Sequence, residues 1–433
     1  MVPKAPRTPM SELAESPLTA GDRNLSVAQA RAAIAAALRP AQPAERVPLM
    51  QALGRPLAAD VVSPMDVPAH DNSAMDGYAF AGSALRSDGL TTLRAVGTLH
   101  AGAPFVGSVG AGECLRIMTG AVMPAGLDTV VPLELCRVDG TQVLIEPGVM
   151  RTGDNRRHRG EDLAVGRPAL LAGRLLQPAD LGLLASLGIE SVSVFRRLRV
   201  ALFSTGDELR TLGQTLDAGC VYDSNRYSLM GALQRLGMDV LDLGLVHDEP
   251  AALQATLEHA MANADVVLTS GGVSMGDADH TRAVLARLGE VAFWKVAMRP
   301  GRPFAFGPLL RQGGAPPCWL FALPGNPVAA LVTFYAFARD ALLQLAGATP
   351  QPLPVLQARC TSALRKRPGR TEFQRGIVEP APGGGWQVRL TGSQGAGILR
   401  SMSEANALVV LQHEQGSVAE GGLVDVWLFD GLV

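Results

Sequence analysis

Residues 264–281 read ADVVLTSGGVSMGDADHT, and the architecture of the central part of the chain can be inferred from them. A short apolar run, residues 266–268, leads into a glycine-rich segment, and apolar residues resume at helical spacing from Ala283. This order predicts a strand, a tight turn and a helix. Such a turn suits anions, because glycines let the backbone approach a ligand and free N–H groups at a helix start attract negative charge. The groups expected to bind the ligand belong to Ser270, Gly271, Gly272, Ser274 and Gly276.

Two carboxylates, Asp277 and Asp279, follow this turn directly. They would repel a phosphorylated ligand unless a hard cation such as Mg²⁺ lay between the two. The pattern therefore predicts a metal-assisted site for a phosphorylated substrate, with both aspartates as candidate metal ligands. The alternative is a helix cap, in which Asp279 accepts hydrogen bonds from amides at its own helix start. The two roles are compatible for two neighbouring acids.

The segments around this stretch alternate strand and helix, which is typical of an α/β unit with a mainly parallel sheet. We expect strands at residues 200–203, 239–243, 266–268, 291–296 and 319–322, and helices at 224–236, 250–262, 279–288 and 327–345. Ligands of an open parallel sheet collect beyond the carboxyl ends of its strands. The loops STGDEL, TSGG and LPGNP should therefore meet in one crevice.

Two of these loops carry further candidates. In STGDEL, Asp207 and Glu208 follow a strand and could reach a metal ion, with Glu208 as the third candidate ligand; the alternative is a turn with solvated acids. In LPGNP, Pro324 and Pro327 stiffen a tight turn before a helix, and its backbone at Asn326 could contact a ligand. The alternative is a purely structural turn.

The segment FWKVAMRPGRPFAFG places three cations, Lys295, Arg299 and Arg302, around one strand and turn. Only three of the 38 basic residues are lysines, so a lysine in the interior of the sequence suggests a site at which lysine and arginine are not interchangeable. Three neighbouring cations suit a ligand with several oxyanion groups. The alternative is a solvated basic turn.

Three loops nearer the N-terminus are dense in polar residues that no core requires. They are DNSAMDGYAF, RIMTGAVMPAG and RRHRGEDL, which contain Asp76, Thr119 and Asp162 respectively. The functional interpretation is a set of contact loops, and the alternative is turns of the Asx type. These loops belong to a segment rich in glycine, proline and short β-branched runs, which predicts a β-rich domain.

Other patterns argue against particular classes of function. The net charge of −2 gives no global attraction to nucleic acid or to an acidic membrane. A basic cluster at residues 365–375 leaves nucleic acid as an alternative, but its single aromatic residue argues against it. The letters GVSMG match a hydrolase elbow, yet Ser274 lies well past the predicted strand end, which disfavours a hydrolase.

The length and the cysteine content of the chain limit the expected number of domains and the expected cellular compartment. A chain of 433 residues should form about three domains. The five cysteines are scattered without a CxxC, which favours a reducing compartment over a disulfide framework or a zinc site. No run reaches the ~18 unbroken apolar residues of a membrane span. We expect a cytoplasmic protein whose first 23 residues are a disordered extension, neither a signal peptide nor an anchor.

Eight segments resemble, in the same order, motifs of the molybdopterin molybdenumtransferases, the family that also supplies the C-terminal domain of gephyrin. They are DNSAMDGYAF, RIMTGAVMP, RGEDL, STGDEL, YDSNRYSL, TSGGVSMGDADHT, FWKVAMRPGRPFAFG and LPGNPVAA. The likeness runs from about Leu25 to the C-terminus, and eight ordered motifs are far more specific than any one of them.

The resemblance implies a multidomain α/β plus β subunit in an elongated homodimer. The implied parts are a discontinuous, dimer-forming domain I (24–61 and 163–195), a β-rich domain II (62–162), a molybdopterin-binding α/β domain III (196–346) and a C-terminal β-barrel, domain IV (347–433). It also implies insertion of molybdate into the dithiolene of adenylylated molybdopterin, with Mg²⁺-assisted release of AMP. The molybdopterin adenylyltransferase is a candidate partner.

The resemblance also assigns roles by motif. Asp279, Asp248 and Glu208 become candidate acids for holding the metal ion or orienting the substrate. The residues contributed by domain II, expected to face domain III of the partner subunit, are Asp76, Thr119 and Asp162.

Further assignments concern the oxyanion groups. Lys295 matches the lysine of the family, Arg302 lies in its basic turn, and Ser401 lies in its C-terminal serine loop. Pro324 and Pro327 match its LPGNP turn. At Arg299 many relatives have lysine; because both side chains are cationic, binding of an oxyanion should survive.

Two rival functions differ in class. A nucleotide pyrophosphatase could use the same α/β unit, but it would not need DNSAMDGYAF and RIMTG, which lie outside that unit. A non-catalytic scaffold is the other rival, because the related domain of gephyrin clusters receptors. No long partner-binding linker is attached here, which favours the enzyme.

Overall fold

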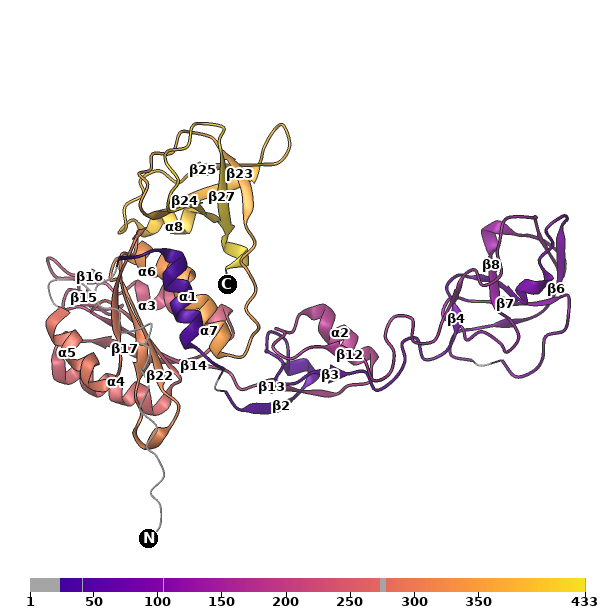
Figure 1. Ribbon diagram of the computed structural model, residues 1–433, viewed down its shortest axis with the longest axis horizontal. Helices are drawn as coiled ribbons and strands as arrows, with labels where there is room; N and C mark the ends of the chain where they lie inside the picture. Colours follow the sequence, from indigo (N-terminus) through magenta and orange to yellow (C-terminus); the bar gives the residue numbers. More distant parts are fainter. Residues whose placement is uncertain (1–23, 41, 104, 273–277, 433) are drawn as a thin grey trace, which may run out of the picture.

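The computed structural model describes residues 24–40, 42–103, 105–272 and 278–432, with residues 278–280 and 282 described by their backbone alone. Figure 1 shows an elongated molecule. An α/β unit and a C-terminal barrel form one end, and a two-part arm extends from them. The predicted extension, residues 1–23, lies outside the described residues, as do Ser274, Gly276 and Asp277.

The α/β unit is built on a seven-stranded sheet in the order β1-β19-β21-β22-β18-β14-β17. Its strands are β1 (Asn24–Leu25), β14 (Arg199–Thr205), β17 (Asp239–Val246), β18 (Val266–Ser270), β19 (Ala292–Val296), β21 (Pro303–Leu309) and β22 (Cys318–Leu323). All five predicted strands are present, and the expectation of a mainly parallel sheet is confirmed. Strand β21, antiparallel to both neighbours, was not predicted, because its prolines and its glycine are rare in central strands.

Helices cover both faces of this sheet. The helices are α3 (Asn225–Arg235), α4 (Pro250–Asn263), α5 (Ala278–Leu288), α6 (Pro327–Thr333), the π-helical turn η5 (Phe334–Ala338) and α7 (Arg339–Leu345). One apolar cluster joins α3 and α6–α7 to one face, and another joins α4 and α5 to the opposite face. The stretch Pro327–Leu345 is long and apolar enough to cross a membrane, but 78% of its most apolar window is buried inside the protein. Core packing accounts for its composition.

The first helix, α1 (Val27–Ala37), packs on the α/β unit. It begins with a capping box: the amide of Ser26 donates to Oε1 of Gln29 at 2.9 Å, and the amide of Gln29 donates to Oγ of Ser26 at 3.2 Å. The apolar stripe of α1 packs beside η5 and α7, and β1 just before it pairs with β19. The stripe thus packs on the α/β unit, although the resemblance assigns this helix to domain I (24–61).

The C-terminal segment forms the expected barrel. Its strands are β20 (Met298–Arg299), β23 (Leu356–Cys360), β24 (Thr371–Pro380), β25 (Trp386–Leu390), β26 (Ala407–Leu411) and β27 (Leu423–Leu428), with the short helix α8 (Leu399–Glu404). Because β24 pairs with both β25 and β26, the five strands β23–β27 close on themselves. Strand β20 comes from the basic turn of the α/β unit and joins the barrel beside β24.

The near part of the arm is discontinuous, as expected. Its elements are β2 (Ala44–Pro48), η1 (Leu49–Gln51), β3 (Val61–Val62), β12 (Pro168–Leu170), α2 (Pro178–Ser186) and β13 (Ser191–Phe195). The chain passes through it twice, since β2 pairs with β13 and β3 with β12. One apolar cluster, with Leu57, Leu184 and Val194 fully buried, holds the two passes together.

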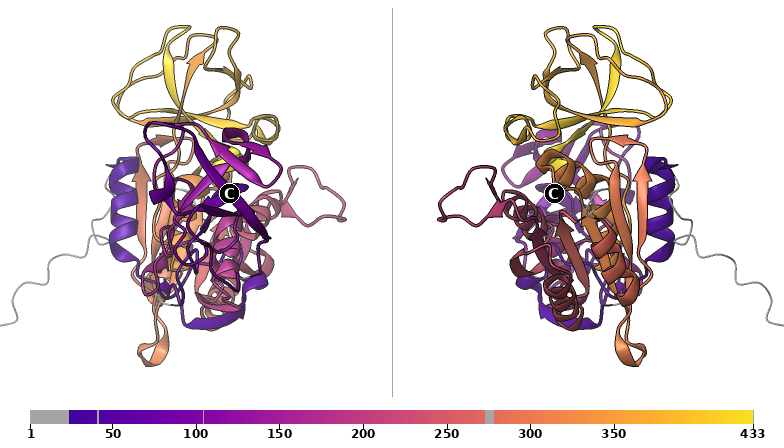
Figure 2. Two further views of the ribbon diagram at one scale, coloured as in Figure 1. Left: turned by 90° about the vertical axis from the view of Figure 1, so that its right-hand side faces the viewer. Right: turned by 90° about the vertical axis from the view of Figure 1, so that its left-hand side faces the viewer.

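The far part of the arm is β-rich, as expected. A six-stranded sheet has the order β8-β5-β7-β6-β10-β9, and β4 pairs with β11 beside it. The strands are β4 (Asn72–Ser73), β5 (Gly77–Phe80), β6 (Thr91–Leu99), β7 (Glu113–Ile117), β8 (Thr129–Pro132), β9 (Arg137–Asp139), β10 (Gln142–Ile145) and β11 (Arg156–Arg157), with the turns η2 (Gly82–Ala84) and η3 (Leu133–Leu135). The views in Figure 2 also show a loop that projects from the α/β unit on the side away from α1. It joins β15 (Leu209–Arg210) to β16 (Val221–Tyr222).

Candidate active site

The predicted loops meet at one edge of the seven-stranded sheet. Strands β14 and β18 are paired up to Ser204 and Ser270, and β18 and β22 up to Ser270 and Leu323. On the other side of β22, Lys295 at the end of β19 lies opposite Pro303 at the start of β21. The acidic loops and the basic turn therefore share the carboxyl edge of the sheet. At about 4.8 Å between strands, β19 lies about 14 Å from β18 and about 19 Å from β14.

The glycine-rich turn after β18 is closely packed. Gly271 has a backbone φ of +98°, and a Cβ added there would lie 2.2 Å from the carbonyl oxygen of Thr205. Gly272 also has a positive φ, of +68°. The hydroxyl of Ser270 donates to the carbonyl oxygen of Pro324 at 3.3 Å and accepts from another side chain, so it is already engaged inside the protein. Of the other members of this predicted set, Gly271 donates its amide to the carbonyl oxygen of Leu323 at 3.0 Å, and Ser274 and Gly276 lie outside the described residues.

The acids gather where β14 and β17 end. The hydroxyl of Thr205 donates to the carboxylate of Asp248, and the amide of Asp248 donates to Oδ1 of Asp207 at 3.4 Å. Asp248, Asp207 and Glu208 are exposed. Across the described residues no three His, Cys, Asp or Glu side chains converge as metal ligands. Asp279 lies in the first turn of α5, but its side chain is outside the described part of the chain.

The cations lie at the other end of this edge. Lys295 is half-buried on β19, and Arg299 and Arg302 are exposed on either side of the turn that follows. This turn rests on α6, since a Cβ added to Gly301, at φ +98°, would lie 2.4 Å from the hydroxyl of Thr333. The position of both arginines is therefore set by packing against the helix that follows LPGNP.

The LPGNP turn connects the sheet edge to the barrel. Asn326 is exposed and precedes α6; its side chain makes no capping hydrogen bond, and Pro327 is the first residue of the helix. The amide of Val328 donates to the carbonyl oxygen of Ala396 at 3.0 Å. Ala396 belongs to the loop at residues 393–397, which we call the barrel loop. The predicted turn therefore has a neighbour from the C-terminal segment.

Arg375 anchors the barrel loop, a role that sequence reasoning missed. It is fully buried on β24 and donates to Oγ of Ser401 at 3.0 Å and to three carbonyl oxygens of the barrel loop. Burial, and secondarily the charge of Arg299, lower its pKa to about 10. The predicted Ser401 is buried too, and its hydroxyl donates to the carbonyl oxygen of Ile398 at 2.6 Å. Strand alternation, which puts Arg375 on the same face as Phe373, was the available signal.

The remaining predicted residues lie on the arm. Oδ1 of Asp76 accepts hydrogen bonds from the hydroxyl of Thr119 at 2.6 Å and from its amide at 2.7 Å. The hydroxyl bond, then the amide bond, lower the pKa of Asp76. Asp162 is exposed, and its amide donates to the carbonyl oxygen of Val67 at 3.0 Å. Within one chain this cluster does not meet the sheet edge, as Figure 1 shows from the positions of β4 and β14.

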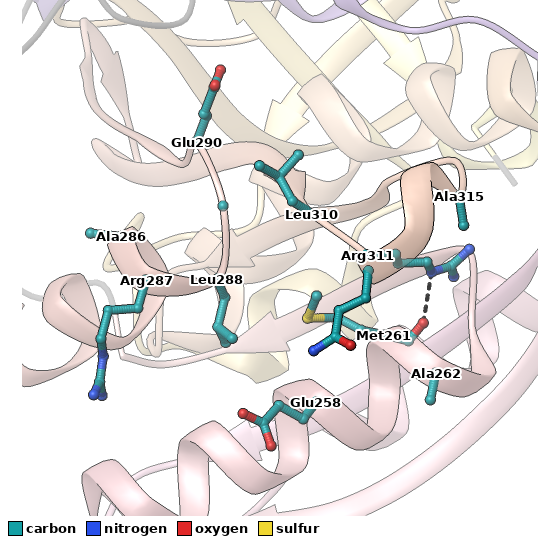
Figure 3. A pocket seen from close by; sticks show the side chains of 12 residues that line it. Glu258, Met261, Ala262, Ala286, Arg287, Leu288, Glu290, Leu310, Arg311 and Ala315 are labelled. Carbon is teal, nitrogen blue, oxygen red and sulfur yellow. Dashed lines mark hydrogen bonds between the residues drawn. The ribbon is translucent and has the colours of Figure 1, made fainter.

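A cavity of about 850 Å³ lies at the opposite, amino edge of the sheet (Figure 3). Glu258 comes from α4, Arg287 from α5 and Glu290 from the segment after it, and Leu310 and Arg311 follow β21. Nε of Arg311 donates to the carbonyl oxygen of Met261 at 2.7 Å, which caps the end of α4. None of the predicted motifs reaches this cavity, and ligands of parallel sheets bind at the other edge.

Three family models match the chain in order. They are described as the MoeA N-terminal region (domain I and II) at residues 25–188, a probable molybdopterin binding domain at 201–344 and the MoeA C-terminal region (domain IV) at 357–429. The molybdopterin molybdenumtransferase of Haemophilus influenzae is 41% identical over 392 residues, which cover 90% of this chain and 95% of the relative. That of a Nostoc species is 36% identical, covering 88% and 87%. The chain belongs to the molybdopterin molybdenumtransferase family.

The solved structures agree with this assignment. A molybdopterin biosynthesis MoeA protein from Pyrococcus horikoshii OT3 superposes with a TM-score of 0.79 at 25% identity, covering 94% of this chain and all of the other. A second MoeA structure from the same species gives a TM-score of 0.72 at 30% identity, with 94% and 99% covered. The resemblance inferred from eight motifs is confirmed.

The family models divide the candidate residues among three regions. The sheet-edge residues lie in the probable molybdopterin binding domain, and Asp76, Thr119 and Asp162 lie in the N-terminal region. Arg375 and Ser401 lie in the C-terminal region. The candidate residues thus come from all three matched regions of the chain.

Proposed function

We propose that this chain inserts molybdate into the dithiolene of adenylylated molybdopterin and releases AMP with the assistance of Mg²⁺. Membership of the family supports the reaction class. The observation that carries the proposal is the shared sheet edge, where exposed acids near β14 and cations near β19 flank two glycine-containing turns. Both molybdate and a pyrophosphate-linked nucleotide are oxyanions, which match such an edge.

The chain itself would bind and orient the substrates. The turn at Gly271 and Gly272 would let a phosphate group approach the backbone, because neither residue carries a side chain. Lys295, Arg299 and Arg302 would neutralise oxyanions at the other end of the edge. The separation of about 14 Å between β19 and β18 suits a ligand with anionic groups at both ends. No protein nucleophile is required, because an oxygen of molybdate or water can attack the phosphoanhydride.

The exposed carboxylates fit Mg²⁺ by their chemistry. Mg²⁺ prefers oxygen ligands and is usually held by one or two carboxylates together with substrate phosphates and water. Glu208 and Asp248 offer such groups, and the family motif adds Asp279. A set of three converging protein ligands is therefore not needed. When bound, the ion would supply charge neutralisation at the phosphoanhydride.

We further propose that the complete site combines two copies of the chain in a homodimer. Asp76, Thr119 and Asp162 lie on the arm, away from the sheet edge of the same chain (Figure 1). The arm of a second copy could bring them to that edge. The enzyme would work in the cytoplasm, where the five cysteines, all free, would stay reduced, and would receive its substrate from the molybdopterin adenylyltransferase.

One assay tests the proposal against its rivals. Purified protein is mixed with adenylylated molybdopterin and Mg²⁺, and AMP is measured with and without molybdate. We expect release that molybdate stimulates. Release indifferent to molybdate would favour a nucleotide pyrophosphatase, and no release would favour a scaffold. Asp279→Asn should abolish turnover while the protein stays folded.

A further inference from the structure

Asn225 bridges the two ligand loops of the sheet edge. It is the first residue of α3, lies in the segment YDSNRYSL and is 8% exposed. Its Nδ2 donates to Oγ of Ser270, after β18, at 2.7 Å and to the carbonyl oxygen of Gly325, after β22, at 2.7 Å. We call this set of contacts the Asn225 bridge.

Hydrogen-bond chemistry fixes the direction of the bridge. The carbonyl oxygen of Gly325 can only accept, so the nitrogen of the Asn225 amide, not its oxygen, must face it. The hydroxyl of Ser270 then accepts from Asn225 and donates its own hydrogen bond to the carbonyl oxygen of Pro324, at 3.3 Å. TSGG is therefore tied to LPGNP twice, once through the side chain of Asn225 and once by the hydroxyl of Ser270 itself.

The loops are already close without the side chain. The amide of Gly271 donates to the carbonyl oxygen of Leu323 at 3.0 Å, and a Cβ on Gly325 would lie 3.9 Å from Cα of Gly271. Backbone contact fixes the bases of the loops, and the bridge fixes Gly325 relative to Ser270. A helix can begin without a buried amide side chain such as that of Asn225. Burying such a side chain is unfavourable unless its hydrogen bonds are made.

We propose that Asn225 is a positioning residue that sets the spacing between the two loops, and thereby the affinity for the adenylyl phosphate of the substrate. The proposal rests on the proposed function, since the loops are taken to hold that substrate. Among the described residues, the side-chain hydrogen bonds of Asn225 go to the two loops, so its effect on the ligand would pass through backbone placement. Loss of the bridge raises the KM and lowers kcat, because displaced backbone amides bind the phosphate less well before and during reaction.

AMP serves as the probe in a calorimetric titration in the presence of Mg²⁺. Asn225→Ala is expected to weaken AMP binding about tenfold, and Ser270→Ala at least as much, because it removes both the contact to Asn225 and the contact to Pro324. Asn225→Asp keeps the shape but cannot donate to Gly325, so it should lose at least as much affinity as Asn225→Ala. The matched control is Asn263→Ala on α4, whose exposed side chain binds only the carbonyl oxygen of His259 on its own helix; it should bind AMP like the wild type.

The outcomes separate the two proposals. If the wild type neither binds AMP nor releases it in a molybdate-dependent way, the proposed function fails. If the wild type does both and Asn225→Ala binds AMP within twofold with unchanged KM and kcat, the positioning role is overturned. A lower unfolding temperature with unchanged KM would make Asn225 purely structural and would overturn it as well. If Asn225→Ala does not fold, the AMP affinity, KM and kcat of Ser270→Ala decide the question instead.

Discussion

Arg375→Met separates the structural role of a buried guanidinium from its effect on the site. The guanidinium donates hydrogen bonds of 3.0, 3.2, 3.3 and 3.0 Å to Ser401 and to the barrel loop. At about 1 kcal/mol each, the loss of these four bonds destabilises the fold by about 4 kcal/mol. Methionine fills much of the same volume without the charge.

The cost of burying the charge offsets most of that loss. Burial lowers the pKa of Arg375 from 12.5 to about 10. A decrease of about 2.5 units corresponds to about 3 kcal/mol by which the fold disfavours the charged side chain at neutral pH. The variant is relieved of this penalty, so the net destabilisation should be about 1 kcal/mol, or about 5 °C in the unfolding temperature of a unit of this size.

Activity should fall far more than stability. Without its anchor the barrel loop can move away from α6, where the carbonyl oxygen of Ala396 now accepts from Val328 at 3.0 Å. A displacement of about 1 Å beside a reacting group lowers the rate by about a hundredfold, and we expect kcat/KM for AMP release to fall by that factor. Arg389→Met, on the exposed face of β25 in the same barrel, is the matched control and should change neither quantity.

The assay pairs scanning calorimetry with molybdate-dependent AMP release. Retention of kcat/KM within threefold in Arg375→Met would refute the link between the barrel loop and the site. A drop of more than about 15 °C in unfolding temperature would show that the hydrogen bonds outweigh the burial penalty by much more than the expected value of about 1 kcal/mol.

Three further predictions concern the two ligand regions. Gly271→Ala should reduce AMP release by about a hundredfold or more, because its Cβ would lie 2.2 Å from the carbonyl oxygen of Thr205; activity within threefold of wild type would contradict this packing. The variants Asp76→Ala and Asp279→Asn should each be inactive alone. After they are mixed and their subunits exchange, about a quarter of the wild-type activity should return, because half of the dimers then carry one intact site of two. No recovery would argue against a site shared by two copies. Thr119→Val should raise the pKa of Asp76, because the hydrogen bonds from Thr119 lower it in the wild type. In the wild type these bonds stabilise the folded protein above the ordinary carboxyl pKa, and this stabilisation is lost as the pH falls through the lower folded-state pKa of Asp76. An NMR titration of the Asp76 carboxyl carbon checks this, and an equal pKa in both proteins would count against it.

The sequence by itself determined the local elements and the family. The run at residues 266–268 and the glycines after it specify a strand and a turn through neighbouring residues alone, and β18 forms there. Gly271 and Gly272 both have positive φ, which the letters of the turn suggested. The parallel order of the strands followed from their alternation with helices. The common edge of the STGDEL, TSGG and LPGNP loops was therefore predictable, whereas the place of the cations on that edge depended on the antiparallel strand β21.

Only the tertiary structure decided which distant surfaces meet. The apolar stripe of α1 packs beside η5 and α7, which lie far from it in the sequence. Arg375 and Asn225 look solvated in the sequence, because burial of a polar group depends on partners that other segments supply. Strand β21 forms despite its prolines because β19 and β22 flank it on both sides. Residues close in the sequence specify torsion angles and periodicity, whereas long-range contacts determine the environment in which each side chain acts.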